Sequence, residues 1–179
     1  MKERVRDTDL RVLSELMING RISDRALAQK IDVSQPTVSR IRAKLEKEGY
    51  IQEYTAIPNL AKLRYEILAF TFIKLRELPQ AKIEEARSVA RSSLGKDCFN
   101  IVMLERGIGL SYDGIAISYH ENYRSYLDLL AWFRQFEFLD VSKIDSYLVS
   151  LQDTIRYKPL TFKTLAQHVV KLAKRESPE

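Results

Sequence analysis

The segment from Ser34 to Gly49 restricts the fold of this chain more than any other part of the sequence. Ser34 is a preferred residue at a helix N-cap, and Pro36 is tolerated in the first helical turn because its missing N–H has no partner there. Three apolar residues follow at helical spacing before Gly49, namely Val38, Ile41 and Leu45. We therefore predict a short helix that buries one side and presents the other to solvent or to a partner.

Two further helices are predicted before Ser34. One runs from Asp7 to Asn19, and the second is capped by Ser23. Their apolar residues recur at helical spacing: Leu10, Leu13, Leu16 and Met17 in the first, and Ala26, Leu27, Ala28 and Ile31 in the second. Asp32-Val33 then makes a tight break before the third helix. The three helices follow one another closely enough to pack as one small unit.

The predicted third helix leaves small and basic side chains outside. Its outer arc contains Pro36, Ser39, Arg40, Ala43 and Lys47, with Gln35, Thr37 and Lys44 on the flanks. Such a helix can sit deep in a DNA major groove, where Gln and Arg hydrogen-bond base edges and Ser, Thr and Lys hold phosphates. A β-ribbon is predicted after it, from Tyr50 to Ile57. Together these elements favour DNA binding over a merely solvated basic face.

Composition permits this hypothesis without requiring it. The chain has 179 residues, with 29 Lys and Arg against 24 Asp and Glu, so its net charge of +5 is only mildly basic. The single cysteine, Cys98, excludes an intramolecular disulfide and indicates a reducing compartment. The sequence has no secretion-signal core and no uncharged apolar run of roughly 18 residues, so we expect a cytoplasmic protein without a membrane span.

The rest of the chain has a different pattern, which predicts the order β-α-β-β-α-β. Strands are predicted at 65–76, 99–105, 110–119 and 141–151, helices at 80–94 and 122–138, and a hairpin loop at 106–109. This order is typical of a ferredoxin-like fold, with helices on one face of an antiparallel sheet. A last amphipathic helix is predicted at 161–175, with Phe162, Leu165, Val169 and Leu172 on one side. We expect that side to pack on its own domain or on a dimer mate.

The predicted fold class is therefore α+β, and the chain divides into four segments. These are a winged helix-turn-helix at 1–58, a linker at 59–64, a ferredoxin-like domain at 65–152 and a C-terminal helical extension at 153–179. The basic residues at the end of the extension, Lys171, Lys174 and Arg175, are more consistent with a solvated tail than with phosphate contacts.

Five motifs in the first sixty residues share the pattern of a known family. They are Asp9-Leu10-Arg11-Val12-Leu13, Gly20-Arg21-Ile22-Ser23, Leu27-Ala28, Ser34-Gln35-Pro36-Thr37-Val38-Ser39-Arg40-Ile41 and the segment 45–56. Together they resemble the leucine-responsive (Lrp/AsnC) regulators, whereas the rest of the chain resembles that family only in fold order. The resemblance implies a prokaryotic transcription regulator, here of archaeal type, that dimerises through its C-terminal sheet. Such dimers often assemble into tetramers or octamers, and many respond to an amino acid or a similar small metabolite.

The resemblance also implies site residues. Matching motif positions give the DNA-facing set as Gln35, Pro36, Thr37, Ser39, Arg40 and Lys44. Lys47 joins this set because it lies on the outer arc of the predicted helix. The resemblance also makes residues 52–55 a wing that flanks the DNA backbone. The family's Gly-x-Tyr-Asp sequence is matched here, with one extra residue, by 109–113. Ser111, Tyr112 and Asp113 are therefore the candidate effector-binding residues. Two possibilities stay open: the domain binds a metabolite, or it only dimerises.

Catalysis and metal binding have little support in the sequence. His120 and His168 lack the neighbours that a metal site needs, and Cys98 opens an apolar strand, which is more typical of a buried small residue than of a nucleophile. We therefore expect no catalytic residue, no cofactor and no metal. Two alternatives remain: a sirohaem-decarboxylase-like enzyme on the same architecture, and a metabolite-sensing or interaction protein whose helix-turn-helix contacts another protein.

Overall fold

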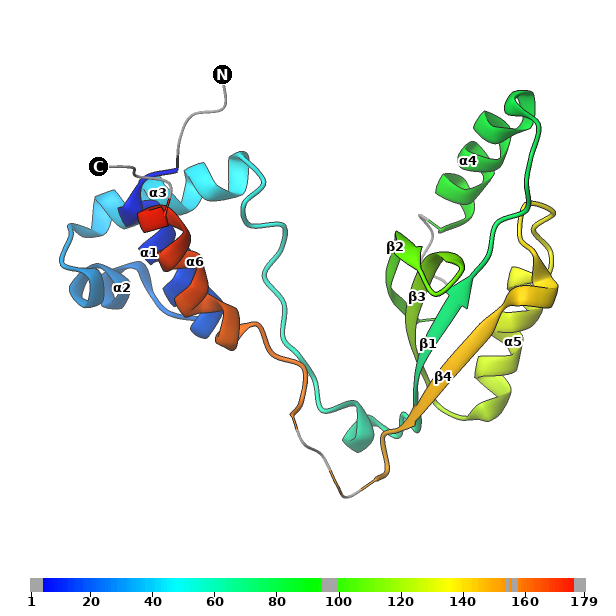
Figure 1. Ribbon diagram of the computed structural model, residues 1–179. Helices are drawn as coiled ribbons and strands as arrows, with labels where there is room; N and C mark the ends of the chain where they lie inside the picture. Colours follow the sequence, from blue (N-terminus) through cyan, green and yellow to red (C-terminus); the bar gives the residue numbers. More distant parts are fainter. Residues whose placement is uncertain (1–4, 95–99, 154, 156–157, 176–179) are drawn as a thin grey trace. The chain divides into compact units, whose positions relative to one another are not determined.

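The computed structural model describes residues 5–94, 100–153, 155 and 158–175, and these form two compact units (Figure 1). The first unit contains Met1–Pro58 together with Tyr157–Glu179, and the second contains Asn59–Arg156. The chain therefore leaves the first unit once, builds the second unit, and returns to the first at its C-terminal end.

The first unit begins with three short helices, α1 (Asp7–Ile18), α2 (Asp24–Ile31) and α3 (Gln35–Lys47). Both predicted N-caps are confirmed. The Ser23 hydroxyl accepts from the backbone N–H of Ala26 at 3.2 Å, and the Ser34 hydroxyl accepts from that of Thr37 at 3.3 Å. Between α2 and α3, Asp32 adopts the left-handed conformation with φ of 59°, which produces the tight break.

One apolar cluster holds these helices together. It contains Val12, Leu16, Leu27, Ala28, Ile31, Val38, Ile41 and Leu45, none of which is more than 6% exposed. The inward side of α3 is therefore confirmed as Val38, Ile41 and Leu45. Because side chains of a helix are fixed relative to one another, burying this stripe determines which arc of α3 faces outward.

The β-ribbon predicted after α3 is not formed: the described residues 50–58 contain no strand. The backbone N–H groups of Tyr50 and Ile51 instead donate to the Leu45 carbonyl, at 2.9 and 3.1 Å, and turn the chain back against the end of α3. An alternating segment becomes a strand only where a neighbour completes a hydrogen-bonded ladder. No other described segment of this unit lies in position to do so, and this part of the prediction is wrong.

The C-terminal helix α6 (Lys163–Arg175) belongs to the first unit, although it follows the second in the sequence. The Ser14 hydroxyl of α1 donates to the Ala166 carbonyl oxygen at 2.8 Å, and both residues are buried. This helix was expected to pack on its own domain or on a dimer mate; within the chain it packs on α1 of the first unit (Figure 1). Its buried side also differs from the predicted stripe, because Phe162 and Leu165 are exposed. The predicted Leu172 side chain lies outside the described residues.

The second unit is a four-stranded antiparallel sheet with the strand order β2-β3-β1-β4. Its strands are β1 (Ile67–Ile73), β2 (Ile101–Gly109), β3 (Tyr112–His120) and β4 (Asp145–Ser150). Its helices are α4 (Gln80–Leu94) and α5 (Tyr123–Phe133), with 3-10 turns at Leu60–Leu63 and Val141–Lys143. The order β-α-β-β-α-β confirms the ferredoxin-like fold. Phe99, where the second strand was predicted to begin, lies outside the described residues.

Side chains alternate across this sheet. Along β1, Ala69, Thr71 and Ile73 are buried, whereas Phe70 and Phe72 between them are half-buried. The buried side faces a core made by Ile73, Ala116, Leu129, Phe133 and Leu139, to which α5 contributes two members. The sheet therefore has one face covered by α5 and an opposite face of large apolar side chains.

The hairpin between β2 and β3 turns at Leu110 and Ser111, not in the predicted loop 106–109. Both residues have positive φ, 50° and 67°, as the two central residues of a type I′ turn require. Residues 106–109 instead continue β2. The register of pairing with β3 shifts between Arg106 and Gly109, so that β2 contains more residues there than the strand it pairs with.

His120 is buried in the sheet unit. It is 1% exposed, its Nε2 lies 2.8 Å from the Ser118 hydroxyl oxygen, and its ring meets that of Tyr126 edge-on. Burial lowers its pKa below the ordinary histidine value, against a weaker opposing effect of the Glu121 charge. The neutral ring is therefore the form that the folded protein favours.

We predict that stability falls on acidification because of His120. A lowered folded pKa means that stability is fully present above the unfolded pKa of about 6.5 and is lost as the pH falls below it. Denaturant unfolding at about pH 7.5 and about pH 5.5 checks this. His120→Gln should reduce the pH dependence, whereas His168→Gln, at an exposed position, should leave it unchanged. Equal pH dependence in all three proteins would exclude His120 as the cause.

Candidate nucleic-acid interface

The outer arc of α3 is exposed along its length. Of the seven residues predicted to face DNA, Gln35, Pro36, Ser39, Arg40 and Lys47 are exposed, and Thr37 and Lys44 are partly exposed. The predicted arc therefore exists as a continuous surface on one helix, and acidic residues occur on that helix only near its C-terminal end.

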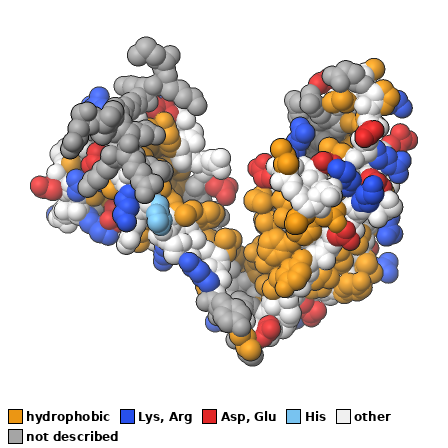
Figure 2. Space-filling model, viewed as in Figure 1, with side chains coloured by type: hydrophobic (Ala, Val, Ile, Leu, Met, Phe, Trp, Pro, Cys, Tyr) orange, Lys and Arg blue, Asp and Glu red, His pale blue; other side chains and the backbone are white. Residues whose placement is uncertain are grey.

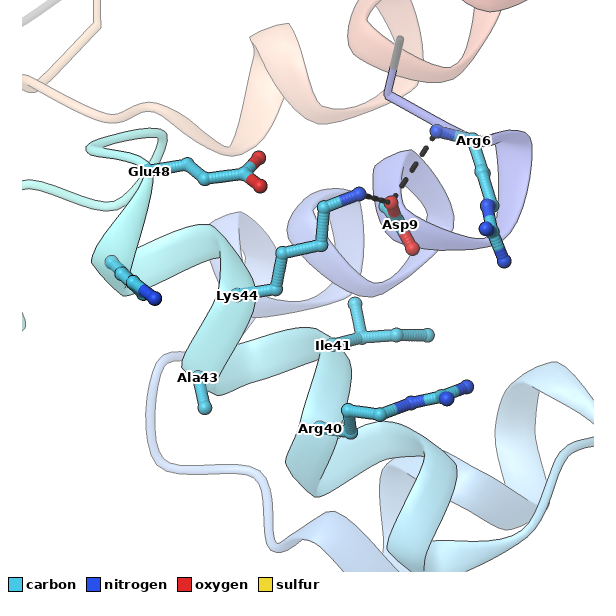
Figure 3. A pocket seen from close by; sticks show the side chains of 8 residues that line it. Arg6, Asp9, Arg40, Ile41, Ala43, Lys44 and Glu48 are labelled. Carbon is cyan, nitrogen blue, oxygen red and sulfur yellow. Dashed lines mark hydrogen bonds and ion pairs between the residues drawn. The ribbon is translucent and has the colours of Figure 1, made fainter. Parts of the chain in front are cut away.

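A positively charged depression of about 410 Å³ lies beside this arc, between the start of α1 and the C-terminal half of α3 (Figure 3). It is lined by Arg6, Asp9, Arg40, Ile41, Ala43, Lys44, Lys47 and Glu48. Four of these side chains are cationic and two are acidic, so the lining carries net positive charge. Such a surface attracts a polyanion and can place its cations against phosphate oxygens.

Lys44 joins α3 to α1 as well as lining the depression. Its Nζ lies 3.0 Å from Oδ2 of Asp9, whose side chain is only 4% exposed (Figure 3). The same carboxylate accepts from the backbone N–H of Arg6 at 3.4 Å. A carboxylate this buried requires a cation, so Lys44 has a structural role in addition to any contact with DNA.

Ser39 and Thr37 are also engaged within the unit. The Ser39 hydroxyl donates to Asp24 of α2 at 2.5 Å, and the Thr37 hydroxyl lies 2.8 Å from that of the cap residue Ser34. These contacts hold both side chains in fixed orientations on the outer arc. Either hydroxyl can still accept from a donor on DNA, because a hydroxyl has two acceptor lone pairs.

Asp24 and Arg42, which sequence analysis did not single out, clamp α2 against α3. Nη2 of Arg42 lies 2.7 Å from the Asp24 carboxylate, and the same guanidinium nitrogen donates to the Ile22 carbonyl at 3.2 Å. Hydrogen bonds from Ser39 and then from Arg42 hold the pKa of Asp24 below its ordinary value. The carboxylate therefore stays ionised and fixes the angle at which α3 leaves α2.

Tyr54 carries this network into the segment predicted as the wing. Nη1 of Arg42 donates to the Tyr54 hydroxyl at 3.3 Å, and that hydroxyl donates to Glu46 of α3 at 2.9 Å. Tyr54 is 47% exposed, and the partial burial of its side chain raises the pKa of the hydroxyl, so the phenol stays protonated and able to donate. Gln52, Glu53 and Thr55 beside it are exposed. The segment 52–55 is thus anchored to α3 by one aromatic side chain instead of by a strand ladder.

The candidate effector residues lie at the start of β3. Ser111 is exposed in the hairpin turn, and the Tyr112 hydroxyl donates to the Asp145 carboxylate. The Asp113 carboxylate accepts from the Leu75 backbone N–H at 2.9 Å and from the Lys74 ammonium at 3.2 Å, and these contacts lower its pKa. The structure brings the three residues together as neighbours, but their strongest polar groups already have partners within the chain.

The remaining candidates from the sequence give no second site. Among the described residues, no group of three or more His, Cys, Asp or Glu could hold a metal ion, and no helix is long and apolar enough to cross a bilayer. Cys98 lies outside the described residues. His168 is exposed on α6.

Comparison with known proteins agrees with this geometry. Residues 5–52 match the winged helix-turn-helix DNA-binding family. The leucine-responsive regulatory protein of Rhizobium meliloti is 34% identical over 76 residues, which are 42% of this chain and 49% of that protein. An uncharacterized HTH-type transcriptional regulator of Pyrococcus furiosus is 34% identical over 106 residues, which are 59% of this chain and 66% of that protein. The chain thus spans about half to two thirds of the length of these curated relatives.

Solved structures share the fold over most of the chain. Escherichia coli AsnC matches with a TM-score of 0.66 at 18% identity, over 88% of this chain and 99% of that one. A transcriptional regulator from Neisseria meningitidis, solved as a complex with L-Met, matches with a TM-score of 0.67 at 17% identity, over 87% and 94%. The chain thus combines a helix-turn-helix unit, which matches the winged helix-turn-helix family, with a ferredoxin-like second unit. The N-terminal part of the chain is similar in sequence to a leucine-responsive regulatory protein, and the fold of the chain is similar to that of AsnC.

Proposed function

We propose that this chain is a sequence-specific DNA-binding transcription regulator that acts as a dimer or a larger assembly in the cytoplasm. The observation that carries the proposal is the outer arc of α3, where Gln35 is exposed at the start of the helix and exposed Arg40 and Lys47 line a positively charged depression. In helix-turn-helix proteins the second helix of the motif enters the major groove, and residues near its N-terminal end meet base edges. In this chain that helix is α3.

Each exposed residue of the arc has a proposed role that follows from its chemistry. Gln35 and Arg40 hydrogen-bond base edges, while Pro36 keeps the helix start narrow enough to approach them. Lys47 and Thr37 hold phosphates. Ser39 and Lys44 face the same groove but are held by Asp24 and Asp9, so their contribution includes fixing the helix in place.

The sheet face opposite α5 is the proposed dimer interface. Most of its cross-strand neighbours are large and apolar, namely Leu68, Phe70, Phe72, Ile115, Ile117, Tyr119, Tyr147 and Val149. The carboxylates of Glu105 and Asp145, opposite Ile115 and Phe72, lie at one end of this face. Figure 2 shows a continuous hydrophobic surface over the strands of the second unit. Apolar faces of twisted sheets pack on one another in two-layer arrangements, and an apolar patch on a charged protein marks an interaction site. A second copy of the chain offers the same face and satisfies the two-fold symmetry of a dimer.

Ile117→Asp should dissociate this dimer. Ile117 pairs with Phe70 near the middle of the proposed interface, and an unpaired carboxylate buried there costs about 3–5 kcal/mol. We expect the dimer dissociation constant, measured by analytical ultracentrifugation, to rise at least ~100-fold. Ala131→Asp, at an exposed position on α5, is the matched control and should leave the dimer intact. A folded Ile117→Asp protein that stays dimeric would show that the copies join through another surface.

We further propose that the second unit binds an amino acid or another small metabolite. The Neisseria meningitidis structure, which shares the fold, is described as an L-Met complex. Ser111, Tyr112 and Asp113 remain the candidate residues. Because Asp113 is held by Lys74 and Tyr112 by Asp145, a ligand there would have to exchange with one of those pairs. An amino acid could do so, since its ammonium can replace Lys74 and its carboxylate can accept from Tyr112.

Salt dependence separates DNA binding from the alternatives. Each phosphate that the protein neutralises adds about 0.9 to the slope of log affinity against log salt concentration. Fluorescence anisotropy across a salt series should therefore show steeply weakening affinity for duplex DNA. A helix-turn-helix used for an apolar protein contact predicts little salt dependence and no DNA affinity. The relatives are named as regulators, which favours DNA binding over catalysis. A rise in melting temperature on addition of a tetrapyrrole would instead favour the sirohaem-decarboxylase-like enzyme.

A further inference from the structure

The DNA-binding unit is connected to the sheet unit at two places in the chain. The first connection follows Pro58 and leads into β1, and the second runs from β4 to α6 through residues 151–162. Units joined by one linker and a small interface are expected to move relative to each other. A second connection restricts that motion only if α6 stays attached to the first unit.

The contact between α6 and α1 is built to keep α6 attached. Ala166 is fully buried, and its carbonyl oxygen accepts from the Ser14 hydroxyl at 2.8 Å. Ser14 is only 7% exposed, so this hydrogen bond is shielded from water while α6 is docked. Leu10 and Met17, one helical turn to either side of Ser14 on the same side of α1, are half-buried.

We propose that residues 151–175 form a second tether that determines which half-site spacing the dimer accepts. In a two-fold dimer, the two recognition helices must lie about one helical turn of DNA apart, roughly 34–36 Å or a multiple. One connection leaves each DNA-binding unit free to search a range of positions. Two connections narrow that range, so DNA with a different spacing is bound more weakly. This inference rests on the proposed function, since it concerns which DNA the dimer accepts.

The tether is tested by cutting it while α6 stays docked. Residues 153–159 of the full-length chain are replaced, without change of length, by a protease recognition site. DNA affinity is measured before and after cleavage on two duplexes that carry the half-sites the intact protein selects from random DNA. One duplex keeps the selected spacing, and in the other it is about 3 base pairs longer. Because the cut lies in the connection, the hydrophobic cores of both units are left unchanged.

The uncut protein should bind the lengthened duplex at least ~30-fold more weakly than the selected one, because two connections restrict each unit. After cleavage this ratio should fall below ~3-fold, while affinity for the selected spacing changes by less than ~3-fold. A cut protein that keeps the original ratio overturns the tether, and so does an uncut protein that binds both duplexes alike. An uncut protein that binds no DNA overturns the proposed function instead.

A matched pair of point variants tests the docking itself. Ala166→Asp places a carboxylate in the buried contact and should make the uncut chain behave like the cut one. Gln167→Asp makes the same charge at the exposed neighbouring position and should retain the spacing preference. Equal behaviour of the two variants would contradict the role of the contact between α6 and α1.

Discussion

Leu45→Ala should lower the free energy of unfolding of the DNA-binding unit by about 2–5 kcal/mol, the largest stability effect we expect in this chain. Leu45 is fully buried, lies in the cluster that joins the helices, and accepts from Tyr50 and Ile51 through its carbonyl. Removing its side chain leaves a cavity that the surrounding helices cannot fill by moving, because each is fixed by its own loops and caps. Denaturant unfolding, followed by circular dichroism, measures the loss.

Leu165→Ala is the matched control for this prediction. It makes the same chemical change in the same unit, but Leu165 is 50% exposed. We expect its effect to stay within about 0.5 kcal/mol, as for an ordinary surface substitution. Similar losses in both variants would mean that the apolar cluster is not the main source of stability of this unit.

Arg40→Ala should reduce affinity for the specific DNA site by about 1–3 kcal/mol, the largest effect on binding that we expect from one side chain of the arc. Arg40 is exposed on the outer arc of α3 and also lines the positively charged depression (Figure 3). If its guanidinium contacts a base edge, the loss falls on the specific site and the sequence preference relaxes. If it contacts phosphate, affinity falls for all sequences alike. The slope of log affinity against log salt concentration then becomes shallower by about 0.9, the contribution of one phosphate contact.

Arg124→Ala controls for the loss of one positive charge. Arg124 lies on α5 of the sheet unit, its side chain is 84% exposed, and it pairs with Asp128 on its own helix at 3.5 Å. Its substitution should leave DNA affinity unchanged. If Arg40→Ala also left affinity unchanged, α3 could not be the helix that contacts DNA.

Local signals in the sequence were sufficient to predict the helices and the order of helices and strands along the chain. Ser23 and Ser34 mark helix starts because an N-cap hydroxyl acts within three residues of itself. The inward stripe of α3 was predictable for the same reason, since helical periodicity is a local property. The outer arc followed as its complement, including the exposed residues Gln35, Arg40 and Lys47.

Contacts between distant segments were not predictable. The expected ribbon after α3 lacks a described neighbouring strand, and alternation alone does not show whether one exists. The partners of Lys44 and Ser39 come from α1 and α2, 35 and 15 residues away, so their engagement has no local signature. One usable signal was missed: Arg42 lies between Val38 and Leu45 at the edge of the buried stripe, where a guanidinium needs partners. The return of α6 to α1 is the longest-range case, since Ser14 and Ala166 are separated by 152 residues.

Recognition of a DNA sequence by this chain is tested by comparing its affinity for two duplexes. Fluorescence anisotropy of the full-length protein is measured on DNA from upstream of its own gene and on a scrambled duplex of the same composition. We expect salt-sensitive binding that is at least ~100-fold tighter on the native duplex. Equal affinity for both duplexes, or no binding to either, would contradict it.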